Sequence, residues 1–173
     1  DAELIGDAKD NIIQSGDGDD YLYGGDGNDV LKSGAGDDLI YGQAGDDVIV
    51  ENGSGSQEYH GGAGNDTLKI ELENFPNLSD DFVGEVDLVN GWSGPENEPD
   101  HELSDKLSGI ENISVYGDKD YIIRGDAEDN IFKSGDGDDY LYGGDGNDVL
   151  KSGAGDDFIN SGRGTDIITT GSG

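Results

Sequence analysis

Aspartate recurs at every ninth residue over two stretches of this chain, always in the same glycine-rich surroundings. From Ser15 the sequence reads SGDGDDYLY, GGDGNDVLK, SGAGDDLIY and GQAGDDVIV; from Ser134 it reads SGDGDDYLY, GGDGNDVLK, SGAGDDFIN and SGRGTDIIT. The common pattern is small-Gly-x-Gly-x-Asp-x-aliphatic-x. Carboxylate and main-chain carbonyl oxygens in flexible loops are the ligands that Ca²⁺ prefers. This spacing therefore favours the binding of a hard cation, and Ca²⁺ above Mg²⁺ or Zn²⁺.

The sixth-position carboxylates are the candidate ligands, because stacked turns would bring them into columns that repel unless cations lie between them. About eight Ca²⁺ ions would offset half of the net charge of −32. The expected pairs are Asp20 with Asp38, Asp29 with Asp47, Asp139 with Asp157, and Asp148 with Asp166.

The full set of candidate ligands combines side chains and glycine carbonyls. The side chains are those of Asp10, Asp20, Asp29, Asp38, Asp47, Asp66, Asp120, Asp129, Asp139, Asp148, Asp157 and Asp166. The carbonyls are those of Gly16, Gly18, Gly25, Gly27, Gly34, Gly36, Gly135, Gly137, Gly144, Gly146, Gly153 and Gly155.

The composition excludes several classes of protein. The 173 residues include 41 Asp and Glu against 9 Lys and Arg, so no basic surface exists for nucleic acid. No apolar run approaches the roughly 20 residues of a membrane span, and the absence of Cys rules out disulfides and thiolate sites. His60 and His101 are far apart and no catalytic triad is recognisable, so we expect no enzyme. A chain this polar and charged needs its cations in order to fold.

The elements that position these carboxylates follow from the same period. One inward aliphatic residue per nine suits a strand of about three residues followed by a six-residue turn. Repeat n then stacks on repeat n+2, which gives an all-β flattened solenoid of parallel strands. We expect the inward residues at Ile12, Leu22, Leu31, Ile40, Ile49, Leu68, Ile122, Ile131, Leu141, Leu150, Ile159 and Ile168.

Looser copies extend the pattern, with apparent breaks. They span Ile5–Ile13, Gly61–Lys69, Val115–Ile123 and Arg124–Phe132. In this reading, single residues interrupt the register at Gln14, His60 and Lys133. The segment Glu51–Tyr59 has Ser56 where the ligand Asp is expected, which weakens a site pairing it with Asp38.

The motif resembles the calcium-binding nonapeptide of the RTX (repeats-in-toxin) family. GGDGNDVLK at Gly24–Lys32 and Gly143–Lys151, and GGAGNDTLK at Gly61–Lys69, meet the pattern GGxGxDxUx. The resemblance implies a right-handed parallel β-roll, calcium-dependent folding and type I secretion to the exterior or cell surface. It also implies that the chain is one module of a larger exported toxin, adhesin or exoenzyme.

The chain divides into two repeat blocks, 5–69 and 115–173, separated by a non-repeat insert, 70–114. The second block ends within a repeat, and Ser15–Asp38 is identical to Ser134–Asp157. Within and beside the insert we expect strands at Leu68–Leu72, Val86–Leu88 and Ile110–Val115, and an acidic loop at Asn90–Asp105. We expect the insert to cover the end of one roll.

The seventh and ninth positions should point outward and give the two sheets different surfaces. One sheet would display Tyr21, Tyr23, Tyr41, Tyr140 and Tyr142, together with Leu39 and Phe158; the other would display Val30, Lys32, Val48, Val50, Val149, Lys151 and Ile167. An exposed aromatic row could bind a surface or glycan ligand, which makes an adhesive module the alternative function. Aromatic and β-branched residues also simply suit flat strands, so both interpretations stay open.

Overall fold

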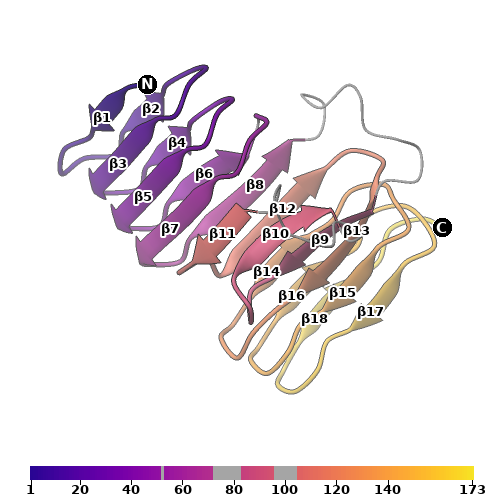
Figure 1. Cartoon of the computed structure of the whole chain (residues 1–173). Helices are drawn as coiled ribbons and strands as arrows, with labels where there is room; N and C mark the ends of the chain where they lie inside the picture. Colours follow the sequence, from indigo (N-terminus) through magenta and orange to yellow (C-terminus); the bar gives the residue numbers. More distant parts are fainter. Residues whose placement is uncertain (52, 72–82, 96–104) are drawn as a thin grey trace.

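The computed structural model describes residues 1–51, 53–71, 83–95 and 105–173, and every regular element in these ranges is a β-strand. The strands form two facing sheets, parallel except at one strand of the insert, and successive coils contribute to each sheet, so the predicted all-β parallel solenoid is confirmed (Figure 1). The described part of the chain contains no helix that is long and apolar enough to cross a membrane.

Sheet A has ten strands and sheet B has eight. In spatial order sheet A contains β1 (Glu3–Ile5), β3 (Tyr21–Asp26), β5 (Leu39–Ala44), β7 (Glu58–Ala63), β11 (Asp105–Ser108), β10 (Trp92–Pro95), β9 (Val83–Asp87), β13 (Asp120–Arg124), β15 (Tyr140–Tyr142) and β17 (Phe158–Asn160). Sheet B contains β18 (Ile167–Thr169), β16 (Val149–Lys151), β14 (Ile131–Lys133), β12 (Asn112–Tyr116), β8 (Thr67–Glu71), β6 (Val48–Glu51), β4 (Val30–Lys32) and β2 (Ile12–Gln14).

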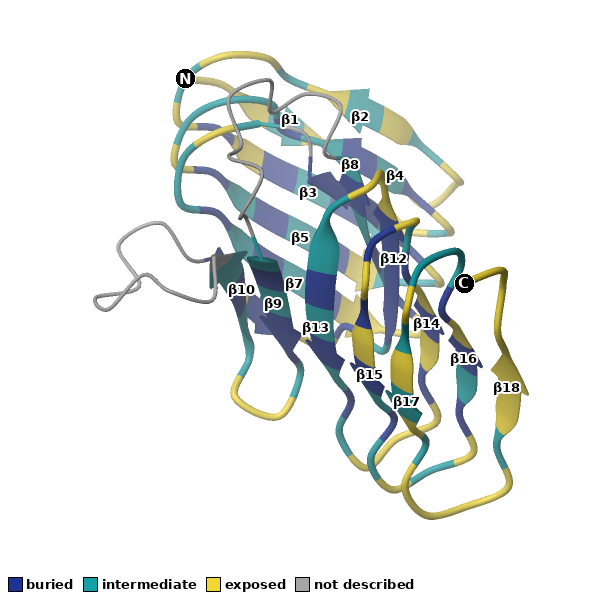
Figure 2. Ribbon diagram, turned by 90° about the vertical axis from the view of Figure 1, so that its right-hand side faces the viewer, coloured by how far each residue is buried: buried dark blue, intermediate teal, exposed yellow. Residues whose placement is uncertain are grey.

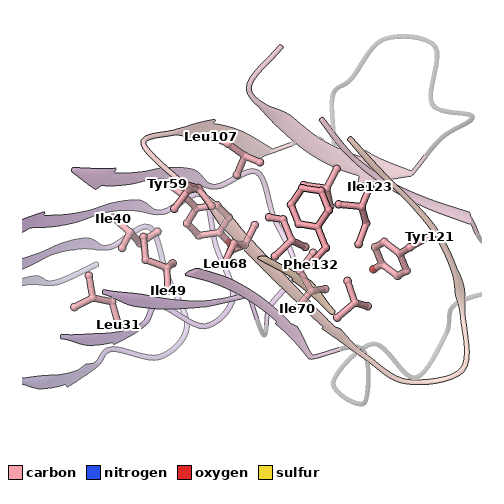
Figure 3. Packing of buried hydrophobic residues seen from close by; sticks show 14 of the residues in the cluster. Leu31, Ile40, Ile49, Tyr59, Leu68, Ile70, Leu107, Tyr121, Ile123 and Phe132 are labelled. Carbon is pink, nitrogen blue, oxygen red and sulfur yellow. The ribbon is translucent and has the colours of Figure 1, made fainter. Parts of the chain in front are cut away.

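Within the tight repeats each nonapeptide stacks on the second nonapeptide after it. Leu22 of β3 lies opposite Ile40 of β5 in sheet A, and Leu31 of β4 lies opposite Ile49 of β6 in sheet B. Their side chains are almost completely buried. Figure 2 shows the buried segments of the strands in dark blue, and Figure 3 shows Leu31, Ile40 and Ile49 in the layer between the sheets. Since each of these four strands contributes one such side chain, the core of these repeats is a single row of apolar residues per sheet.

Three of the four looser repeats lie in a register one residue later than the sequence predicted, whereas Gly61–Lys69 keeps the predicted register with Leu68 in the core. Ile13, Ile123 and Phe132 face the core, whereas Ile12 and Ile131 are exposed and Ile122 is only half-buried. Gln14 and Lys133 then become ordinary ninth-position residues, opposite Lys32 and Lys151. The predicted interruptions at these two residues are therefore wrong.

The extra residue in the first block is Glu51 at the end of β6, and it displaces the next repeat by one position. Leu39 lies opposite Glu58, nineteen residues later. The ninth position of this repeat is therefore His60, opposite Tyr41, and its fifth and sixth positions are Ser56 and Gln57. The expectation that Ser56 occupies the ligand position is wrong.

The insert lies between the two blocks and contacts both. In sheet B, β12 pairs with β8 on one side and β14 on the other, so this sheet continues directly from block to block. In sheet A, β11 pairs with β7, β9 pairs with β13, and β10 runs antiparallel between β11 and β9 (Figure 1). The expectation that the insert covers one end of one roll is too narrow, since the insert joins two blocks that share both sheets.

One segment of the insert that was predicted as a loop contains a strand. Strand β10 lies inside the segment predicted as a loop, Asn90–Asp105, because Trp92 and Ser93 pair with neighbours on both sides. Leu72 and residues 96–104 lie outside the described residues. Larger buried side chains, Tyr59, Tyr121 and Phe132, fill the core near the insert (Figure 3).

Candidate calcium sites

The turns form two edges of the roll, and each edge carries a column of sixth-position residues. At the B-to-A edge, where the chain passes from sheet B to sheet A, these are Asp20, Asp38, Asp139 and Asp157; at the A-to-B edge they are Asp29, Asp47, Asp66, Asp148 and Asp166. All four predicted pairs lie on adjacent coils.

One carboxylate oxygen of each sixth-position residue has a main-chain partner. The Asp29 N–H donates to Asp47 Oδ1 at 2.8 Å, and the Asp47 N–H donates to Asp66 Oδ1 at 2.8 Å. The other predicted pairs show the same contact at 2.8–3.1 Å. This bond fixes the carboxylate and leaves its second oxygen to be explained.

The second oxygen is buried and has no hydrogen-bond partner in seven of these aspartates. They are Asp20, Asp29, Asp38, Asp47, Asp66, Asp139 and Asp148, each at Oδ2. A buried carboxylate oxygen with no partner carries a desolvation cost that a bound cation would remove. The donor set therefore fits calcium.

Each orphaned oxygen at the A-to-B edge faces a glycine and a carbonyl. At Gly42 an added Cβ would overlap Asp47 Oδ2 and lie 2.5 Å from the Gly61 carbonyl oxygen. Gly24 and Gly143 are related in the same way to Asp29 and Asp148. Both oxygens thus converge on a space that only a first-position glycine leaves open.

Burial raises the pKa of these carboxyl groups. Desolvation is the main cause at Asp66 and Asp139, whose pKa values rise to about 6, and the facing carboxylates raise them further. The pKa values of Asp38, Asp47 and Asp148 rise for the same first reason. A cation would oppose these shifts by stabilising the ionised form.

The glycines predicted as carbonyl ligands also stack. An added Cβ at Gly36 would overlap the Gly18 carbonyl oxygen, and one at Gly155 would overlap the Gly137 carbonyl oxygen. The same relation holds for Gly34 over Gly16 and Gly153 over Gly135, while Gly25, Gly27, Gly144 and Gly146 lie against Asp7, Lys9, Asp126 and Glu128. Among the described residues no three or more His, Cys, Asp or Glu side chains gather as a metal site, so any cation needs these carbonyls.

A family model described as the RTX calcium-binding nonapeptide repeat (4 copies) matches the chain over five ranges, residues 3–31, 23–50, 51–69, 122–150 and 142–173. The matches cover more than half of the chain. The chain belongs to the RTX calcium-binding nonapeptide repeat family. The search of curated proteins found no match. The RTX repeats bind calcium and are typically non-catalytic, and their proteins are typically exported.

Three predicted RTX ligands lie in a different column. Asp10, Asp120 and Asp129 occupy the fifth position, and the sixth position of their repeats holds Asn11, Tyr121 and Asn130. Asp10 Oδ1 accepts from the Asn28 N–H at 2.9 Å, Asp120 Oδ1 from the Asp138 N–H at 2.8 Å, and Asp129 Oδ1 from the Asn147 N–H at 2.7 Å. The expectation that these three residues belong to the sixth-position column is wrong.

The fifth position forms a second ladder that the sequence analysis missed. Its side chains accept from the coil that follows, whereas sixth-position side chains accept from the coil that precedes. Asn28 and Asp46 both do this, at 3.0 Å, so an amide serves as well as a carboxylate. Asp or Asn recurs at the fifth position of most repeats, and this recurrence could have predicted the second ladder.

Gln57 interrupts the sixth-position column at the B-to-A edge. Its side-chain amide donates to the Gly36 carbonyl oxygen at 3.1 Å, so a neutral donor satisfies an oxygen that a cation would otherwise bind. Gln43, which replaces a second-position glycine, adopts the left-handed conformation with φ of 81°. Its backbone therefore follows its glycine counterparts despite the steric cost of a Cβ.

Two acids that the sequence analysis missed are buried together beside the insert. Asp105 accepts from the Gln57 N–H at 2.8 Å and from Ser93 Oγ at 3.2 Å, and Glu51 accepts from the Tyr59 hydroxyl. Burial raises the pKa of Asp105 to about 7 and raises that of Glu51 well above its usual range, where the charge of Asp105 adds to the effect.

We expect this acid pair to make the folded protein less stable as the pH rises. Both pKa values are higher in the folded state than in the unfolded state, so the folded state binds these protons more tightly. The free energy of unfolding therefore falls as the pH rises to and through 7. At saturating calcium we compare the free energy of unfolding of the Glu51→Gln/Asp105→Asn variant with that of the parent. The difference should grow in favour of the variant by on the order of 1–3 kcal/mol from pH 6 to pH 8. Urea unfolding at both pH values measures this. Glu3→Gln, at an exposed site, is the control, and a parallel pH response of parent and double variant would contradict the prediction.

The outer face of sheet A carries the predicted aromatic row. The rings of Tyr23 and Tyr41 stack with centroids 5.3 Å apart and planes within 1°, and Tyr41 stacks on His60 at 4.5 Å. In the second block Phe158 contacts both Tyr140 and Tyr142. On sheet B, Val50 is buried, contrary to expectation.

A hydrogen-bonded line of Ser108, His60 and Glu58 crosses from β11 to β7 on the same face. His60 Nδ1 lies 2.6 Å from Ser108 Oγ, and Nε2 lies 3.2 Å from Glu58 Oε1. This connectivity is that of a nucleophilic serine triad. However, Glu58 also pairs with Lys106 of β11 at 3.4 Å, and the His60 ring is stacked on Tyr41. We interpret these contacts as cross-strand pairs that hold β11 on β7.

Proposed function

We propose that this RTX segment is a calcium-triggered folding module of a larger exported protein. In low calcium the chain is an expanded polyanion, and in a calcium-rich exterior it folds into the roll. The module supports the secretion and folding of an attached toxin, adhesin or exoenzyme through type I secretion, and has no catalytic activity of its own. Its location is outside the cell or on the cell surface.

The observation that carries this proposal is the set of buried Asp Oδ2 atoms without partners at successive coils. The chain has a formal net charge of −32, and folding gathers part of that charge into two columns. Ions that bind only the folded form stabilise it by about 2.7 kcal/mol each at a hundred times their dissociation constant. Several such sites acting together make folding steeply dependent on calcium.

A calcium titration of the purified chain, starting in chelator, tests the proposal. Far-UV circular dichroism and Trp92 fluorescence should report a cooperative coil-to-β transition at about 10⁻⁴ to 10⁻³ M Ca²⁺. Magnesium at the same concentrations is the control and should produce little change, since it demands stricter octahedral geometry. A chain that already has its full β content in chelator would overturn the proposal.

A second candidate function is adhesion or glycan binding through the outer face of sheet A. Tyr21, Tyr140 and Phe158 each expose nearly half of their surface there. The stacked rings of Tyr23 and Tyr41 cover each other's faces, so these two offer mainly edges and hydroxyl groups to a ligand. Glycan-array binding that is lost when Tyr21 and Tyr140 are changed to Ser, with calcium-dependent folding intact, would support this candidate. Unchanged binding would exclude it.

A further inference from the structure

The insert supplies an acidic residue at the point where the A-to-B edge leaves the first block. Glu111 directly precedes β12, as Asp66 directly precedes β8 and Asp47 directly precedes β6. Because β12 pairs in parallel with β8, Glu111 lies on the coil next to Asp66. It therefore takes the place of a sixth-position aspartate, although it belongs to no nonapeptide.

The main-chain contacts at this interval match those of the interval before it. The Asp66 N–H donates to Glu111 Oε2 at 2.7 Å, as the Asp47 N–H donates to Asp66 Oδ1 at 2.8 Å. The Asn112 N–H donates to the Asp66 carbonyl oxygen at 2.9 Å, as the Thr67 N–H donates to that of Asp47 at 2.8 Å. The interval between Asp66 and Glu111 thus keeps the register of a repeat.

The oxygen atoms that remain also match. Asp66 Oδ2 is buried without a hydrogen-bond partner, and the exposed fraction of Asp66 is 0%. A Cβ added at Gly61 would lie 2.6 Å from Asp66 Oδ2 and overlap the Gly109 carbonyl oxygen. At Gly42 the corresponding atoms are Asp47 Oδ2 and the Gly61 carbonyl. An orphaned carboxylate oxygen and a carbonyl therefore converge here as they do within the repeats.

We propose that Asp66, Glu111 and the Gly109 carbonyl form a calcium site that joins the first block to the insert. This inference rests on the calcium binding of the repeats and assigns a ligand outside them. Glu111 also raises the pKa of Asp66 by its charge, as a facing carboxylate does within the repeats.

Among the described residues, which leave out 96–104, the B-to-A edge shows no equivalent site at this level. Its sixth-position column continues through Gln57, whose amide binds the Gly36 carbonyl, and Asp105, whose two oxygens accept from the Gln57 N–H and from Ser93. Both oxygens of Asp105 thus have partners, in contrast to Asp66. In its described part, the insert therefore continues the row of candidate calcium ligands at the A-to-B edge.

The test is a count of bound calcium in Glu111→Gln against the parent. The glutamine keeps the acceptor for the Asp66 N–H and removes the charge, so the variant should fold in saturating calcium and bind one ion fewer. Isothermal titration calorimetry and metal analysis after gel filtration give the count. Glu3→Gln, the same change at an exposed side chain outside the candidate sites, should bind as many ions as the parent. Asp47→Asn should lose one ion and is the positive control.

An unchanged count in Glu111→Gln, with an ion lost in Asp47→Asn, would overturn this inference and leave the proposed function intact. A parent chain that neither binds calcium nor folds in it would instead overturn the proposed function. If Glu111→Gln fails to reach the parent's β content, Glu111→Asp and Glu111→Asn form a pair of equal length. The Asp variant should then bind one ion more than the Asn variant, and equal counts would overturn the inference.

Discussion

Gly42→Ala should block calcium binding at one interval of the A-to-B edge and raise the calcium concentration needed for folding. Its new Cβ would overlap Asp47 Oδ2 and lie 2.5 Å from the Gly61 carbonyl oxygen, the two atoms that converge on the candidate site. Overpacking alone costs about 1–3 kcal/mol, and the loss of one ion adds about 2.7 kcal/mol at a hundred times its dissociation constant. The calcium midpoint by circular dichroism and the ion count measure both effects.

Gly16→Ala is the matched control for this substitution. A Cβ at Gly16 would meet nothing within 4 Å, and the Gly16 carbonyl is kept. Neither glycine has a positive φ, so backbone strain does not separate the two variants. Equal shifts of the calcium midpoint in the two variants would contradict the assignment of the space beside Gly42 to a cation.

Asp47→Asn and Asp46→Asn should differ sharply although the residues are neighbours. Asp47 is buried with an unpartnered Oδ2, so the amide should remove one ion and raise the calcium midpoint. The Asp46 side chain is exposed and accepts the Asn65 N–H at 3.0 Å, and asparagine already performs the same task at Asn28. Asp46→Asn should therefore fold at the parent's calcium concentration.

Whether Asp47→Asn stabilises or destabilises the folded state should also depend on the calcium concentration. Burial raises the pKa of Asp47, so the charge is unfavourable in the folded protein when no cation is bound. Residual structure in chelator should then increase in this variant, while stability at saturating calcium falls. Circular dichroism in chelator and urea unfolding in calcium measure the two limits. A loss of structure under both conditions would show that Asp47 acts only through its hydrogen bond to Asp29.

The tight repeats could be predicted from the sequence because every one of them has glycine at the fourth position, which fixes the residues at the sixth and eighth positions. Three looser repeats lack that glycine, so the choice between adjacent apolar residues, as in Ile12–Ile13 and Ile131–Phe132, had no fixed reference. The neighbouring Asp10–Asn11 and Asp129–Asn130 gave the same ambiguity for the ligand position. A shift of one residue exchanges the inner and outer faces of a strand. Choosing the wrong one of two adjacent residues therefore misplaced every residue of that repeat by one position.

The contributions of the insert had no signal in the sequence. Glu111 reaches Asp66 and Asp105 reaches Gln57 only because β12 and β11 add to the two sheets after a long excursion of the chain. Neither acid stands at a nonapeptide spacing. Glu51 also had no signal, since a single extra residue is visible only when the register on both sides is known.

The two sheets of the roll have unequal numbers of strands, and this difference affects the shape of the roll. Sheet A has ten strands and sheet B has eight, so the outer face of sheet A is longer by two strand spacings, about 10 Å. We therefore expect the axis of the roll to bend at the insert, with sheet A on the convex side. The row formed by Tyr23, Tyr41 and His60 and the row formed by Tyr142 and Phe158 then face diverging directions. A flat partner would touch one aromatic row at a time, and only a concave or flexible partner would reach both.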